Sequence, residues 1–325
     1  MLLRNRTMLI YAIGLICLLL LTSCEYTSTP AAVPTKTATT GRDKSGPYTP
    51  TSAITPTLTT SGTPDTTPTR YTSRVILSGA RRPDDLAFDP QGRLVFSDFY
   101  NGTVSRINTD GSVTVLVSGV AGPEGIVFLS DGTMIIAEQR TNRILSLAPG
   151  TKSLTVLRTL PGTPAGPPCK DGVDGIAFDS ITKTLIIPDS PTGNVYRMSL
   201  DGQKLTLLAS GIARPVGAAV DQYGTVYVAD ECGGSLWTIA ANGKTTHVGG
   251  FGKLDDVALD SHGNILVIDL APSIHALIRI RRSTGKRETL ASRGFIEPQG
   301  LAIDKNDDIF VSDDYANIIV EYKPV

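Results

Sequence analysis

The pentapeptide Gly175-Ile176-Ala177-Phe178-Asp179 recurs in altered form at five other places in the chain, and this repetition decides the fold. Each copy joins a glycine or aspartate to a short apolar run. The copies begin at Asp85, Gly125, Gly175, Gly217, Asp256 and Gly300. Successive copies start 40, 50, 42, 39 and 44 residues apart. Self-similarity with a period of this size is typical of a repeat architecture, in which one structural unit is used several times.

A second apolar segment that ends in an acid follows each copy. These segments are Leu94–Asp98, Met134–Glu138, Leu185–Asp189, Val226–Asp230, Ile265–Asp269 and Ile309–Asp313. A third segment comes next, as at Arg143–Leu147 and Ser235–Ile239, and a glycine-containing turn then leads to a fourth. Four short strands in each unit of about 40–45 residues, joined by such turns, predict the blades of an all-β propeller.

The two ends of the repeat region set the number of blades. The sixth repeat stops after its third strand, Ile318–Tyr322. The missing fourth strand stands at the other end, because Arg74–Gly79 resembles the fourth strands Val113–Gly119 and Leu205–Gly211. We therefore expect residues 71–325 to form a six-bladed β-propeller of four-stranded blades, with the N-terminal strand closing the last blade. Closure removes an open sheet edge that would favour aggregation.

The start of the chain predicts export. Arg4 and Arg6 precede an apolar run, Met8–Leu21, that is shorter than the roughly 20 residues of a membrane-spanning helix and suits a signal peptide. The run ends in Leu21-Thr22-Ser23-Cys24, which resembles a bacterial lipobox. We expect residues 1–23 to be a lipoprotein signal peptide and Cys24 to carry the lipid, on the outer face of the cell membrane. The alternative is a simple secretory signal or an uncleaved anchor, in which Cys24 is incidental.

Residues 24–70 differ in composition from the rest of the chain. They are rich in Thr, Ser and Pro and contain almost no large apolar side chains. Such a stretch cannot bury enough apolar surface to offset the entropy lost on ordering. We therefore predict a disordered tether between the lipid anchor and the propeller.

Three segments carry a family resemblance. Pro123–Ile126, Ala137–Ile144 and Val173–Asp179 resemble NHL repeats and the related SMP-30/gluconolactonase-like propellers. The resemblance covers residues 72–323 and implies the six-bladed fold. It implies little about activity, because one propeller scaffold carries many unrelated functions.

Two sets of acids fall on one face of the predicted propeller, where first strands begin and second strands end. The outer set recurs in every repeat, and we interpret it as structural, with each carboxylate accepting hydrogen bonds from nearby loop backbone. Its members are Asp98, Glu138, Asp189, Asp230, Asp269 and Asp313.

The inner set varies between blades and is the more informative one. It comprises Asp84, Glu124, Asp174, Val216, Asp255 and Gln299, and Asp85 and Asp256 add two carboxylates beside it. Acids that converge on a narrow channel repel one another, so they raise their pKa values or bind a cation. Hard oxygen ligands suit Ca²⁺ or Mg²⁺, and the predicted metal ligands are Asp84, Glu124, Asp174, Asp255 and Gln299. The alternative is a water-filled channel whose acids merely face solvent.

The family resemblance raises the question of catalysis. In SMP-30/gluconolactonase-like lactonases, Glu, Asn and Asp hold a channel metal and the Asp also acts as acid and base. Glu124 and Asp174 stand at matching positions and, with Asp255, are the candidate catalytic residues, but the next blade has Val216 and no inner position is Asn. Lyases of the streptogramin-lyase kind need a channel-facing His, and no inner position is His. The sequence therefore leaves open whether the protein is an enzyme.

The cysteines predict one disulfide. Cys169 lies in a Gly/Pro-rich insertion before the first strand of blade three, and Cys232 follows the second strand of blade four. Both loops lie on the same face of adjacent blades, and an exported protein meets oxidising conditions. The alternative is two free thiols.

The charge of the chain limits the kinds of partner that it can bind. The formal net charge is −1 and the propeller has no basic runs, which argues against nucleic acid. Our leading hypothesis is a membrane-tethered binding, scaffold or sensor propeller with a divalent cation in its central channel. Besides the membrane, its partner would be a protein or a small neutral or basic ligand on the acidic face. The alternative is a metal-dependent hydrolase of the lactonase type.

Overall fold

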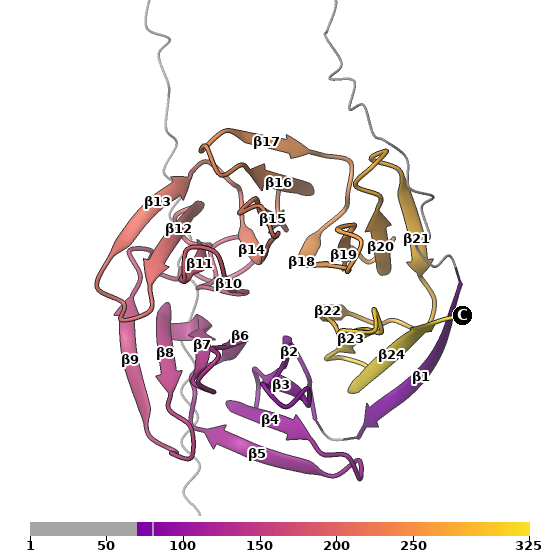
Figure 1. Ribbon diagram of the computed structural model, residues 1–325, viewed down its shortest axis with the longest axis horizontal. Coiled ribbons are helices and arrows are strands. Elements are labelled where there is room, and N and C mark those ends of the chain that lie inside the picture. The colour runs from indigo at the N-terminus through magenta and orange to yellow at the C-terminus, as the bar shows by residue number, and fades with distance from the viewer. Residues whose placement is uncertain (1–69, 80) are drawn as a thin grey trace, which may run out of the picture. The chain divides into compact units, whose positions relative to one another are not determined.

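Six antiparallel sheets stand around a central axis in the computed structural model of the chain (Figure 1). The structure describes residues 70–79 and 81–325. The predicted signal peptide, the lipid site Cys24 and the tether up to residue 69 lie outside the described residues. Within the described part, no helix is long and apolar enough to cross a membrane.

Each sheet is one blade, and its strands follow one another outward from the axis. Blades one and two consist of β2 (Leu86–Phe88), β3 (Leu94–Asp98), β4 (Thr103–Ile107) and β5 (Val113–Ser118), then β6 (Pro123–Phe128), β7 (Met134–Glu138), β8 (Arg143–Leu147) and β9 (Leu154–Thr159). Blades three and four consist of β10 (Ala177–Asp179), β11 (Thr184–Asp189), β12 (Asn194–Ser199) and β13 (Leu205–Ala209), then β14 (Pro215–Val220), β15 (Val226–Asp230), β16 (Ser235–Ile239) and β17 (Thr245–Val248). Blades five and six consist of β18 (Leu254–Leu259), β19 (Ile265–Asp269), β20 (Ala276–Ile280) and β21 (Arg287–Ala291), then β22 (Pro298–Ile303), β23 (Ile309–Asp313), β24 (Ile318–Pro324) and β1 (Tyr71–Ser78).

The predicted ring closure is confirmed. The N-terminal strand β1 pairs antiparallel with β24, the last strand of the chain, from the pair Tyr71–Pro324 to the pair Ser78–Ile318. The strand begins at Tyr71, three residues before the Arg74 expected from sequence. The predicted six-bladed all-β propeller, with its last blade completed by the N-terminal strand, is therefore the observed fold.

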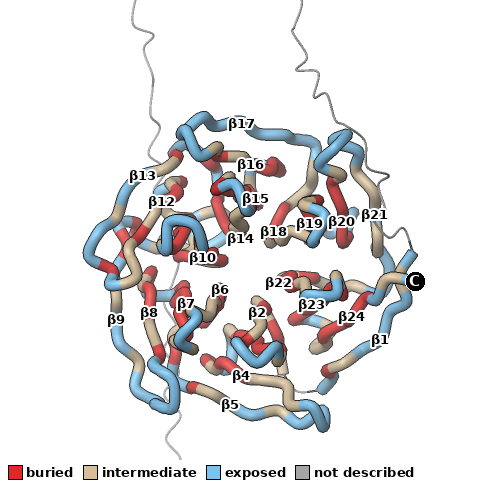
Figure 2. The backbone as a smooth tube through the Cα atoms, in the orientation of Figure 1, coloured by how far each residue is buried: buried red, intermediate tan, exposed pale blue. Residues whose placement is uncertain are grey.

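The second strand of each blade forms the core. Every residue of β3, β7, β15, β19 and β23 is buried, which explains why these strands are continuous apolar runs. Apolar clusters lie between neighbouring blades, as where Val104 of blade one packs with Ile136 of blade two. Phe88 and Phe310 meet edge to face at 5.3 Å and join blade one to blade six. Figure 2 shows burial decreasing toward the outermost strands, and β17 is exposed throughout.

The first strands approach one another closely around the channel. A Cβ atom on Gly175 would lie 2.8 Å from the Cα of Gly217, so only glycine fits there. Blades one and five have aspartates instead, and each side chain reaches the next blade. Asp85 Oδ2 accepts a hydrogen bond of 2.8 Å from the backbone N–H of Ile126, and Asp256 Oδ2 accepts one of 2.8 Å from that of Leu301. These two carboxylates therefore link neighbouring blades.

A buried arginine of blade five contacts both a partly exposed glutamate and the closing strand. The Arg279 side chain is fully buried, and its Nη2 lies 2.8 Å from Glu288 Oε2. Its Nη1 donates a hydrogen bond of 3.1 Å to the hydroxyl of Tyr71 on β1. Hydrogen bonds from Arg281 and Arg279 lower the pKa of Glu288 to about 2.

We predict that Glu288→Gln destabilises the propeller by about 3 kcal/mol at pH 7, because the substitution leaves the Arg279 charge buried without its counter-ion. The pKa of Glu288 is lower in the folded chain than its ordinary value, so the stabilisation is present above pH 4.5 and is lost as the pH falls toward 2. Urea denaturation of both chains at pH 7 and pH 3 measures this. Lys286→Gln removes an exposed cation beside the same carboxylate and serves as the control; an equal loss in the two variants would contradict the role of Arg279.

Candidate functional site

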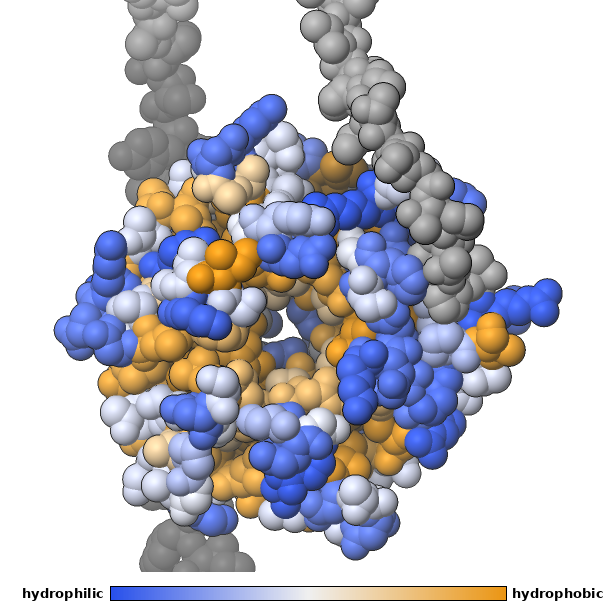
Figure 3. Space-filling model, in the orientation of Figure 1, coloured by the Kyte–Doolittle hydropathy of each residue, from blue (hydrophilic) through white to orange (hydrophobic). Residues whose placement is uncertain are grey.

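A pocket of about 470 Å³ lies on the face where first strands begin and second strands end, which we call the upper face. Figure 3 shows the ring open at its centre. Of the 17 lining residues, eight are Asp or Glu, and only Arg214 and Lys253 are basic. The pocket therefore combines a concave shape with a marked excess of carboxyl groups.

Three positions in each blade supply most of this lining. The first is the inner set predicted from sequence, of which all but Val216 line the pocket. The second follows each outer acid and comprises Phe99, Gln139, Ser190, Glu231, Leu270 and Asp314. The third precedes each inner position by two residues and comprises Arg82, Gly122, Gly172, Arg214, Lys253 and Glu297. The second and third sets were not predicted from the sequence, although their fixed offsets from the predicted acids place them on the same face.

The outer acids position the third set. Asp230 Oδ1 accepts a hydrogen bond of 3.0 Å from the backbone N–H of Arg214, and Asp269 Oδ1 accepts one of 2.9 Å from that of Lys253. The other outer acids likewise accept backbone N–H groups, at Asn101, Ala121, Gly162 and Glu297. The structural role predicted for the outer set is therefore confirmed. Most of these bonds reach back to the loop that enters the same blade.

Gln139 bridges two of the candidate catalytic acids. It lies in the 3₁₀ turn η1 (Gln139–Thr141), directly after β7. Its side-chain Nε2 donates hydrogen bonds of 3.1 Å to Glu124 Oε1 and of 3.1 Å to Asp174 Oδ2. The two acids that match the lactonase motif are thus neighbours, but an amide group stands between them.

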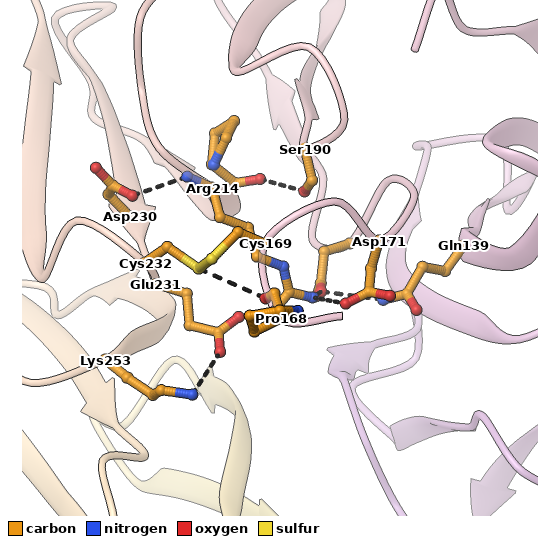
Figure 4. Close-up of polar contacts among 12 residues, drawn as sticks. Gln139, Pro168, Cys169, Asp171, Ser190, Arg214, Asp230, Glu231, Cys232 and Lys253 are labelled. Carbon is orange, nitrogen blue, oxygen red and sulfur yellow. Dashed lines mark hydrogen bonds and ion pairs between the residues drawn. A yellow bond between two sulfur atoms is a disulfide. The ribbon is translucent and has the colours of Figure 1, made fainter. Parts of the chain in front are cut away.

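Arg214 places a guanidinium among the acids of blades three and four (Figure 4). Its Nη2 lies 3.0 Å from Asp174 Oδ2 and 3.6 Å from Asp171 Oδ2. The Nη1 atom pairs with Glu231, whose other oxygen lies 3.5 Å from Lys253 Nζ. One buried arginine therefore pairs with three carboxylates on this side of the pocket.

The predicted disulfide is present. Cys169 and Cys232 are bonded, with their Cα atoms 6.1 Å apart. The bond fixes the insertion of blade three to the upper loop of blade four. The insertion contributes Pro167 and Asp171 to the pocket, and Glu231 adjoins Cys232. The disulfide thus links the two loops whose acids, Asp171 and Glu231, pair with Arg214.

Burial and mutual repulsion raise the pKa values of the inner acids. Loss of solvation raises the pKa values of Asp84, Glu124 and Asp255 well above their ordinary range, and neighbouring carboxylates raise them further. Burial also raises the pKa of Asp174, but the positive charge of Arg214 opposes that effect. The Asp84 carboxyl, which lies beside Glu124, raises the pKa of Glu124 further. The inner acids therefore lack enough positive charge to ionise together.

The donor set does not fit a lactonase-type metal centre. The predicted ligands Asp84, Glu124, Asp174, Asp255 and Gln299 all line the one pocket. Gln139 and Arg214 already occupy oxygen atoms of Glu124 and Asp174, however, and the matching position in the next blade is the buried Val216. Among residues 70–79 and 81–325, no group of three or more His, Cys, Asp or Glu side chains is arranged to hold a metal ion. We therefore derive no reaction step through a metal.

Comparisons with known proteins identify the fold. No family model matches the sequence, and no curated protein matches it. A solved structure assigned as a gluconolactonase is 14% identical over 79% of this chain and 93% of its own length, with a TM-score of 0.64. A streptogramin B lyase is 13% identical over 78% of this chain and 97% of its own, with a TM-score of 0.60. Virginiamycin B lyase from Staphylococcus aureus is 15% identical over 74% of this chain and 80% of its own length, with a TM-score of 0.58.

These likenesses agree with the resemblance seen in the sequence to SMP-30/gluconolactonase-like propellers. At such low identity they support the propeller fold and do not carry an activity to this chain. The described residues that line the pocket include no histidine. The chain therefore shares its architecture with lactonases and lyases, while its upper face has its own set of side chains.

We predict that replacing both Cys169 and Cys232 by serine lowers the free energy of unfolding by about 4 kcal/mol, because the disulfide closes a long loop in the unfolded chain. The sequence separation of the two cysteines is 63 residues. Denaturation with and without dithiothreitol measures the effect. The reductant should destabilise the native chain by a similar amount and leave the double variant unchanged; an unchanged native chain would contradict a stabilising role.

Proposed function

We propose that this chain is a lipid-anchored, extracytoplasmic propeller that binds a small, positively charged ligand in its upper-face pocket. The observation that carries the proposal is the charge of the pocket, which has eight carboxyl side chains against Arg214 and Lys253. A volume of about 470 Å³ lies within the range of small-molecule sites. The proposed function is therefore the capture or sensing of a ligand.

The electrostatics favour a cationic ligand. The inner acids crowd together with raised pKa values because they are desolvated and repel one another. A ligand that brings a protonated amine or guanidine offers these acids both a counter-charge and hydrogen-bond donors. Arg214 does the same for Asp174 and Glu231 on one side of the pocket, whereas Asp84 and Asp255 line other parts of it.

A metal-dependent lactonase is the second candidate. It is supported by the placement of Glu124 and Asp174 beside each other and by the architecture shared with a structure assigned as a gluconolactonase. The amide of Gln139 and the guanidinium of Arg214 weaken it, because they occupy the carboxylate oxygens that a metal would need. A divalent ion in the channel, Ca²⁺ or Mg²⁺, belongs to this second proposal.

The proposed location follows from the N-terminal sequence. The apolar run Met8–Leu21 and the lipobox-like Leu21–Cys24 support export and lipid attachment at Cys24. The Thr/Ser/Pro-rich residues 24–70 would then act as a spacer. The propeller would be displayed on the outer face of the membrane, where its pocket meets external ligands.

We predict that small amines bind the full chain in detergent micelles and that their neutral isosteres do not. Isothermal titration of agmatine and of 1,4-butanediol measures this difference. Asp255→Asn should weaken agmatine binding about tenfold, because it removes one buried counter-charge. Asp201→Asn, in an exposed turn outside the pocket lining, should leave the affinity unchanged.

The same preparation tests the alternatives. Equal binding of agmatine and butanediol, or binding of neither, would overturn the proposal. Stoichiometric Ca²⁺ binding together with Ca²⁺-dependent hydrolysis of a lactone panel would favour the hydrolase. In that case Asp174→Ala should abolish turnover.

A further inference from the structure

One carboxylate at the edge of the pocket has an unused oxygen. Asp314 follows the outer acid Asp313 at the end of β23, lines the pocket and is only 2% exposed. Its Oδ2 lies 3.1 Å from Arg82 Nη2. Its Oδ1 is buried and has no partner in hydrogen-bonding geometry, although the backbone N–H of Tyr315 acts on this carboxyl and lowers its pKa. Buried polar atoms are almost always hydrogen-bonded in native proteins, so an exception in a ligand pocket points to a group that the ligand supplies.

Aromatic rings flank this carboxylate. Tyr100 of blade one and Tyr315 of blade six both line the pocket and are 47% and 52% exposed. The Arg82 guanidinium lies 3.6 Å from the ring centroid of Tyr100 and 4.5 Å from that of Tyr315. The two tyrosines and Asp314 therefore already hold one cation of the protein's own. We call these three residues the tyrosine edge of the pocket.

Arg82 does not bond to both carboxylate oxygens of Asp314. It pairs with Asp314 through Oδ2 and donates a second hydrogen bond of 3.4 Å to the Asp314 backbone oxygen. The Oδ1 atom stays without a donor. Two more acids of the pocket lining interact electrostatically with Asp314. Glu297 raises the pKa of Asp314, and Asp314 raises the pKa of Asp84. The surroundings thus favour a second positive group and disfavour an anion.

The chemistry of the tyrosine edge distinguishes between kinds of cation. A lone carboxylate oxygen beside two phenol rings is a poor donor set for Ca²⁺ or Mg²⁺, which prefer six or more oxygen ligands. A quaternary ammonium could lie on the rings but has no N–H to satisfy Oδ1. A protonated primary amine or a guanidine offers both the charge and the donor.

We propose that Asp314 Oδ1 accepts a hydrogen bond from the protonated amine or guanidine of the ligand, which lies against Tyr100 and Tyr315 at the edge between blades one and six. The inference rests on the proposed function and adds the chemical class of the ligand and the residues that select it. Arg82 stays on Oδ2 and in contact with both rings. The ligand is thus an organic cation with N–H donors.

Titration calorimetry of the full chain in detergent micelles tests the inference with two probes. Agmatine carries N–H donors at both ends, and tetramethylammonium carries charge without donors. The native chain should bind agmatine at least about tenfold more tightly than tetramethylammonium. Asp314→Asn should weaken agmatine binding about tenfold, and the matched control Asp201→Asn should not change it.

A second variant guards against misfolding of Asp314→Asn. Tyr315→Ala alters a side chain that is half exposed and leaves Asp314 in place, and it should weaken agmatine binding about threefold. If the native chain binds no amine, the proposed function fails. If it binds agmatine and Asp255→Asn weakens that binding, but Asp314→Asn and Tyr315→Ala do not, the proposed function stands and this inference is wrong. Equal affinity for tetramethylammonium would also overturn it.

Discussion

The carboxylate at the end of each second strand is the interaction on which the upper face depends. Asp230, for example, accepts backbone N–H groups from both Arg214 and Gly233, and so joins the loop that enters its blade to the loop that leaves the second strand. The same arrangement occurs at Asp313 with Glu297 and Ala316. In every blade this acid accepts a backbone N–H from the entering loop, so the neighbouring positions are free to vary without loss of the fold, and the pocket is built from them.

The sequence predicts the fold well because its signals are local and repeated. The apolar runs ending in Asp98, Glu138 and Asp269 match β3, β7 and β19 to the residue, since a strand buried on both faces must be continuously apolar. Ring closure was also predictable. The last repeat lacks its fourth strand, and the N-terminal strand before the first repeat has the sequence pattern of a fourth strand. The Cys169–Cys232 bond followed from the loops that both cysteines occupy.

The site was only partly predictable, because it depends on side chains that meet across blades. The inner acids were identified, but Arg214 was not, although its charge determines how Asp174 and Glu231 behave. Gln139 was missed for the same reason, since its contact with Asp174 crosses from blade two to blade three. Fixed offsets in the sequence place these residues on the upper face, but they do not show which side chains pair across blades. These pairings decide whether the carboxylates of the pocket surround a cation of the protein itself, such as Arg214, or a metal ion.

The central claim is that the upper-face carboxyls stay partly protonated until a cationic ligand supplies the missing charge. Proton release on binding tests it most directly, by calorimetry of agmatine at pH 6.5 in two buffers of different ionisation enthalpy. Binding should release protons, because ligand charge lowers the raised pKa values of acids such as Asp84, Glu124 and Asp255. Binding without proton release, or with proton uptake, would contradict it.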